Sequence, residues 1–105
     1  MATIVLLYAP CPSRGVAVRL TKQLLSARLI GCANIVASAS CYRWRGKLVQ
    51  RREYIMLAKT TAGKAAAARA FSVKHHPYEV PLIGQLGLHV NAAYARWLMQ
   101  QVRSE

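Results

Sequence analysis

The order of apolar segments predicts an α+β domain, a ferredoxin-like βαββαβ sandwich followed by a C-terminal helix. Two observations support this prediction. Short runs rich in β-branched residues alternate with segments whose apolar residues recur every three or four positions, as they do on one face of a helix. The chain also has 105 residues, a length that suits one core, so we assign residues 1–105 to a single domain.

The first half of the chain predicts a strand, a helix and a hairpin. Residues 3–9 read as a buried strand closed by the turn signal PCPS, and Ser13 is a suitable N-cap for the next helix. That helix is amphipathic, and we expect Gly31 to be its C-cap. Residues 32–45 and 48–59 have strand character on either side of an Arg-Gly turn, which predicts a β-hairpin.

The second half predicts a helix, a strand and a helix. Residues 60–74 are rich in alanine and precede Pro77, which stops the helix. Residues 80–90 suit a strand with a bulge or bend at its two glycines, and residues 92–103 suit a last helix. Two helices cover one face of such a sheet. Because strands such as IVLL and YIMLA are apolar throughout, we expect self-association to cover the other face.

The charge balance is strongly basic. Lysine and arginine number 15 against three acids, Glu53, Glu79 and Glu105, which gives a formal net charge of +12 and predicts non-specific attraction of polyanions. The absence of aspartate disfavours hydrolysis by paired carboxylates and sites for Mg²⁺ or Ca²⁺, which need several oxygen ligands.

The cysteines and the apolar start of the chain bear on location. The three cysteines cannot all pair within one chain and form no C-x-x-C motif, so we expect free thiols in a reducing compartment. The start TIVLLYA lacks a basic leader, and no apolar run approaches the roughly 20 residues that cross a bilayer. We therefore expect a cytoplasmic protein without membrane insertion.

Cys11 precedes a helix N-terminus, a setting that can lower the pKa of a thiol, although a passive exposed cysteine is the alternative. Cys32 and Cys41 are expected to be small buried apolar residues.

Five stretches resemble the CutA, or divalent-cation tolerance, family: ARLIGCANI, YRWRGKL, LAKT, HHPYEVP and YARWL. They cover nearly the whole chain in the family's order. The resemblance implies a tight homotrimer, an architecture like that of the PII signalling proteins, and a link to copper and other divalent cations. Three departures each remove a cation-facing group: PCPS stands where acidic residues are common, Leu82 where many members have a second glutamate, and Leu7 where several have a cysteine.

The adjacent histidines, His75 and His76, allow two interpretations. Neighbours on a helix point about 100° apart and cannot chelate one metal as an i,i+4 pair does, which favours a structural role. In that role one ring caps the helix end and the other packs beneath Tyr78. The alternative is weak binding of Cu²⁺ through His75 or His76, because imidazole sites favour copper over other divalent ions.

The run CYRWRGKLVQRR alternates aromatic and basic residues. Such interleaving can bind single-stranded nucleic acid, so a polyanion-binding protein is the main alternative function. However, the resemblance assigns Tyr42, Trp44 and Lys47 to contacts between subunits. The favoured interpretation is a non-enzymatic trimeric binding or signalling protein whose intersubunit cleft receives a metal ion or a small anionic ligand. The residues implied for that cleft are Trp44, Lys47, Lys59, Tyr78, Glu79 and His89. An enzyme that uses Cys11 or a histidine is a third possibility.

Overall fold

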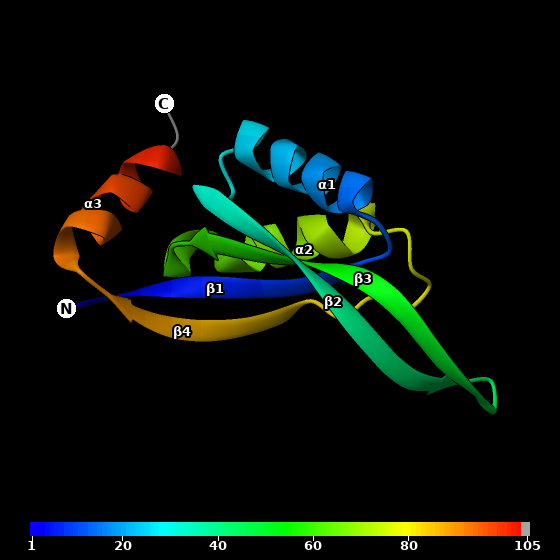
Figure 1. Ribbon diagram of the computed structural model, residues 1–105. Helices are drawn as coiled ribbons and strands as arrows, with labels where there is room; N and C mark the ends of the chain where they lie inside the picture. The colour runs from blue at the N-terminus through cyan, green and yellow to red at the C-terminus, as the bar shows by residue number, and fades with distance from the viewer. Residues whose placement is uncertain (104–105) are drawn as a thin grey trace.

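The computed structural model describes residues 1–103 and has the predicted order of elements (Figure 1). Within this part of the chain the elements are β1 (Ala2–Cys11), α1 (Arg14–Ser26), β2 (Cys32–Trp44), β3 (Lys47–Thr60), α2 (Ala62–His75), β4 (Gly84–Val90) and α3 (Ala92–Gln101). The α+β class and the ferredoxin-like order are confirmed. None of these helices combines the length and the apolar character needed to span a bilayer.

The strands form one antiparallel sheet in the order β2-β3-β1-β4. β1 and β4 pair in unbroken register from Ala2 opposite Val90 to Tyr8 opposite Gly84. Of the bulge or bend predicted at the two glycines of this strand, the bulge is therefore wrong. The strand also begins at Gly84 rather than at position 80, because the preceding segment contains Pro81, which has no N–H for a ladder hydrogen bond.

The boundaries of α1 show one correct and one wrong prediction. Ser13 is the N-cap, and its Oγ accepts a hydrogen bond of 3.1 Å from the Val16 N–H. The helix ends earlier than Gly31, with Ala27 as C-cap and Arg28 in the left-handed region at φ 55°. Arg28 thus adopts the left-handed backbone conformation that a glycine usually adopts after the end of a helix.

The core lies between the sheet and one layer of helices. Helices α1 and α2 cover the same face of the sheet (Figure 1). Alternate residues of β1 point into this layer because side chains of a strand alternate between faces. The largest fully buried apolar side chains are Leu7, Leu24, Ile30, Met56 and Leu98.

The hairpin of β2 and β3 extends beyond the rest of the sheet. β1 pairs with β3 only from Tyr54 onward, so residues 47–53 have β2 as their neighbour on one side only. The ribbon projects from the body of the molecule in Figure 1. The predicted Arg-Gly turn is confirmed: Arg45 and Gly46 both have positive φ, 51° and 78°, as a two-residue type I′ turn requires.

Helix α3 packs on β1 and β3, and Gly31 marks its contact. A Cβ atom at position 31 would lie 2.4 Å from Leu98 Cδ1 and 3.2 Å from Gln101 Cβ. The glycine therefore permits close approach of α3.

We expect Gly31→Ala to lower the free energy of unfolding by about 1–3 kcal/mol, because the new methyl group overpacks the contact with Leu98. Urea unfolding measures the change, and amide exchange should show loss of protection in α3. Gly15→Ala is the matched control: its Cβ would meet only Ser13 Oγ, at an ordinary contact distance of 3.9 Å, and we expect it to be neutral or slightly stabilising. Equal stability of the two variants would contradict the close contact.

Candidate functional site

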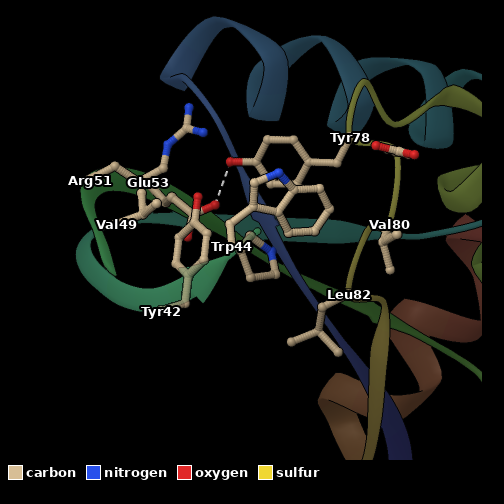
Figure 2. Close-up of a pocket in the computed structure, with 10 residues that line it drawn as sticks. Tyr42, Trp44, Val49, Arg51, Glu53, Tyr78, Val80 and Leu82 are labelled. Atoms are coloured by element: carbon tan, nitrogen blue, oxygen red, sulfur yellow. Dashed lines mark hydrogen bonds between the residues drawn. The ribbon is translucent and has the colours of Figure 1, made fainter. Parts of the chain in front are cut away.

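A pocket lies between the hairpin and the segment that connects α2 to β4 (Figure 2). Its volume is about 620 Å³. The strand residues that line it alternate along β2 and β3, so they share the face of the sheet opposite to α1 and α2. The lining consists of Pro10, Tyr42, Trp44, Val49, Arg51, Glu53, Tyr78, Glu79, Val80 and Leu82.

A hydrogen bond between Tyr78 and Glu53 forms the polar wall of this pocket. The Tyr78 hydroxyl donates to Glu53 Oε2, as the dashed line in Figure 2 shows. Glu53 is only 6% exposed, so its carboxylate depends on such a donor. Burial raises the pKa of Tyr78, and the bond to Glu53 and the negative charge of Glu53 raise it further. The Arg51 guanidinium carbon lies 5.5 Å from the centre of the Tyr78 ring.

His76 holds Tyr78 in place. Its Nδ1 accepts a hydrogen bond of 3.1 Å from the Tyr78 N–H, and its Nε2 lies 2.8 Å from the Pro10 carbonyl oxygen. A carbonyl only accepts, so this network places the ring proton on Nε2. The His76 and Tyr78 rings are 4.7 Å apart, the contact that the structural interpretation of the histidines predicted. His76 is buried at the C-cap of α2, and both of its ring nitrogens are engaged.

His75 has a different environment. It is exposed at the last position of α2, where its ring stacks on Phe71 at 4.1 Å. Among the residues that the structure describes, no three histidine, cysteine or acidic side chains are grouped to hold a metal ion.

Three of the six predicted cleft residues meet at the pocket: Trp44, Tyr78 and Glu79. Glu79 forms an exposed ion pair of 3.5 Å with Arg45, which connects the loop to the hairpin turn. Lys47 pairs opposite Trp44 in the ladder and lies beside the pocket without lining it.

Lys59 and His89 lie elsewhere in the single chain, so their predicted place beside Tyr78 is not formed within one subunit. Lys59 is six residues along β3 from Glu53, a separation of about 20 Å in an extended strand. Its Nζ donates to Asn34 Oδ1 and lies 3.8 Å from Cys32 Sγ. His89 Nδ1 lies 3.2 Å from Thr3 Oγ1. Contact of these two side chains with a neighbouring subunit's pocket stays a prediction.

Sequence reasoning missed Arg51 and Glu53 as members of the site. The available signal was strand parity, because positions 49, 51 and 53 share a face with positions 42 and 44 once the hairpin register is known. Register is fixed here by the two-residue turn. The loop residues Val80 and Leu82 carry no comparable signal.

Cys11 corrects both expectations for that residue. It is the last residue of β1 and fully buried, rather than exposed in a loop. Burial, and then the negative charge of Glu53, raise the pKa of the Cys11 thiol to about 11. The thiol donates to the Ala9 carbonyl oxygen at 3.5 Å, so this cysteine is poorly placed as a nucleophile. Cys32 is half-buried and Cys41 is exposed, because none of residues 1–103 covers the outer part of the hairpin.

Comparisons with known proteins agree with this architecture. Residues 5–101 match the family model of the CutA1 divalent ion tolerance protein. The divalent-cation tolerance protein CutA of Thermotoga maritima is 35% identical over 94% of this chain and 99% of its own length. The crystal structure of CutA1 from Ehrlichia chaffeensis superposes with a TM-score of 0.94 at 29% identity, covering 99% of both chains. The Thermus thermophilus Cut A1 structure gives a TM-score of 0.84 at 35% identity over 95% of this chain and 98% of its own. The chain therefore belongs to the CutA family of divalent-ion tolerance proteins.

Proposed function

We propose that the protein is a non-enzymatic binding protein of divalent-cation tolerance that acts as a homotrimer in the cytoplasm, and that the pocket beside the hairpin is its ligand site. Signalling of the PII type, in which a bound small ligand changes the surface shown to a partner, is the form of action we favour. The names of the relatives support the cation-tolerance role. The free state of all three cysteines suits a reducing compartment.

The observation that carries this proposal is the chemistry of the pocket. Two of the three acids in the chain, Glu53 and Glu79, line one pocket together with the rings of Tyr42, Trp44 and Tyr78. Arg51 adds a positive group to the same wall. Convergent polar groups in a largely apolar cavity are typical of a small-molecule site. Of the two ligands expected from the sequence, a metal ion and a small anion, the two carboxylates favour the metal ion or another cationic group.

The residues present fit a weakly bound metal ion only. Glu53 and Glu79 are oxygen ligands, but the Glu53 carboxylate already accepts a hydrogen bond from Tyr78. The exposed His75 ring is the better ligand for Cu²⁺, because His76 would have to give up its bonds to Pro10 and Tyr78. A bound divalent ion would supply positive charge at the protein surface.

We expect Cu²⁺ to bind weakly and through His75. Titration calorimetry on the wild type, His75→Ala and His76→Ala measures this, and His75→Ala should remove most of the binding heat because, of the two adjacent histidines, only His75 is exposed. Lys74→Ala is the matched control, since it removes the adjacent exposed side chain without removing an imidazole. Tight binding that survives the double substitution of His75 and His76 would contradict the proposal.

Ligand binding in the pocket is tested in the same titrations by following the fluorescence emission of Trp44. The chain has two tryptophans, so the variant Trp97→Phe leaves Trp44 as the sole tryptophan reporter at the pocket. Cu²⁺ and inorganic phosphate are the two probes, one for each sign of ligand charge. We expect the minor fraction of Cu²⁺ that still binds in His75→Ala to change Trp44 emission saturably, and this change to weaken when Glu53→Gln/Glu79→Gln is added. Emission unchanged by both probes would remove the support for this pocket as the ligand site.

A further inference from the structure

The acidic residues of the described chain lie on one side of the sheet, whereas its basic residues lie on both. Both acids within residues 1–103, Glu53 and Glu79, line the pocket on the sheet face opposite to the helix layer. The sequences of α1 and α2 contain no acidic residue. The outer face of the helix layer therefore carries positive charge without any acidic side chain of its own helices to neutralise it.

Four exposed cations form what we term the helix-layer face: Arg14, Arg19 and Lys22 on α1, and Lys74 on α2. Arg19 and Lys22 are three residues apart and therefore neighbours on the helix surface. Arg14 and Lys22 are separated by eight residues, about 12 Å along the axis. The exposed residues of α2 that precede Lys74 include Ala66, Ala67 and Ala70, whose small side chains leave the charged groups accessible to a large partner.

The sequence indicated the hairpin as the polyanion site. Some of the basic side chains of the hairpin, however, interact with other residues of the same chain. Arg45 pairs with Glu79 at 3.5 Å and lies 5.6 Å from the centre of the Trp44 ring. Arg51 lies against the Tyr78 ring, within the pocket wall. The aromatic rings that would stack on bases, Tyr42 and Trp44, also line the pocket. The hairpin is therefore the poorer of the two basic surfaces for a nucleic acid.

We propose that the helix-layer face binds the phosphate backbone of duplex nucleic acid without reading its sequence. Charge complementarity supports this partner, because each strand of a duplex carries one phosphate for about every 3.4 Å of the helix axis, and these phosphates need only accessible cations. A bilayer is the poorer match. Surface-bound amphipathic helices insert an apolar face, whereas the apolar faces of α1 and α2 are buried against the sheet in the core.

The test compares two triple variants that change the net charge equally. The helix-layer variant is Arg19→Gln/Lys22→Gln/Lys74→Gln, and the control is the hairpin variant Arg43→Gln/Lys47→Gln/Arg52→Gln. Binding to a duplex oligonucleotide is measured by fluorescence anisotropy at several salt concentrations. Each phosphate contact contributes about 0.9 to the slope of log affinity against log salt, so losing three contacts should reduce the slope by about 2 to 3. We expect that reduction in the helix-layer variant and a change below about 1 in the hairpin control.

Three outcomes would overturn the proposal. An equal loss in both variants would show that net charge alone attracts the duplex. A larger loss in the hairpin variant would return the site to the hairpin. Binding of the wild type to vesicles of anionic lipid, with no measurable binding to duplex at low salt, would identify a membrane partner instead. Circular dichroism and urea unfolding of both variants establish that they are folded, and their Cu²⁺ titrations show whether the proposed cation role is separate from this surface.

Discussion

Replacing Tyr78 with phenylalanine is expected to lower the free energy of unfolding by about 2 kcal/mol at neutral pH, since hydrogen bonds to charged groups contribute about 1.5–3 kcal/mol. The substitution removes the hydroxyl that donates to the buried Glu53 carboxylate. The substitution keeps the ring that packs on His76, so the decrease in the free energy of unfolding measures mainly the contribution of the hydrogen bond. Urea unfolding followed by circular dichroism measures the difference.

The control for this substitution is Tyr54→Phe. Tyr54 is half-buried at the edge of the core on the other face of β3, and we expect loss of its hydroxyl to change stability by less than about 0.5 kcal/mol. A double-mutant cycle with Glu53→Gln isolates the pair, because coupled neighbours show interaction energies of about 0.5–3 kcal/mol. A coupling near zero, or equal losses in Tyr78→Phe and Tyr54→Phe, would contradict the role given to this bond.

The same bond predicts a dependence on alkaline pH. The pKa of Tyr78 is raised in the folded protein, first by burial and then by Glu53, whereas an unfolded tyrosine titrates near pH 10 or so. The stabilisation is therefore complete below about pH 10 and declines above it, because the unfolded chain loses its proton first. The stability difference between wild type and Tyr78→Phe should shrink as the pH rises above this value.

The fold was largely predictable because its determinants are local. Short sequence patterns predict the N-cap at Ser13 and the Arg-Gly turn, and the structure shows both. The errors arose where tertiary pairing decided the outcome. β1 continues to Cys11 through a proline because β3 provides partners for this segment, with Pro10 opposite Ile55 and Cys11 opposite Tyr54. Propensity alone indicated a turn at those residues.

The candidate site was only half predictable, because it combines a hairpin with a distant loop. The resemblance of the HHPYEVP stretch located Tyr78 and Glu79, and the hairpin motif located Trp44. Glu53 was missed because its importance depends on burial and on a partner 25 residues away in the chain. Burial of that kind is a property of the packed loop rather than of the residues around Glu53. The predicted positions of Lys59 and His89 depend on a second chain, which local sequence patterns do not describe.

We expect the protein in solution to be a homotrimer with three times the 11.6 kDa mass of one chain. Large apolar side chains remain exposed on the sheet face opposite to α1 and α2 and on the loop beside it. Leu86 is 60% exposed, Leu82 56% and Val36 47%, and the hairpin and β4 have unpaired outer edges. A surface of this kind on a free monomer would favour aggregation, whereas a closed symmetric assembly buries it. Light scattering at micromolar concentration measures the mass.

The assembly should be broken by charge on that sheet face and not by charge elsewhere. Leu86→Lys/Leu88→Lys places two cations on the face, and we expect monomers or aggregates because the lysines would be desolvated without partners. The matched control Leu25→Lys/Val73→Lys adds the same charge at similarly exposed residues of the helix layer, and should remain trimeric. Repulsion among three basic chains opposes assembly, but exposed charges beyond about 8 Å are largely screened at 0.15 M salt. Apolar burial contributes about 25 cal/mol per Å² at any salt concentration, so it should prevail. A folded wild-type monomer at micromolar concentration would contradict the trimer.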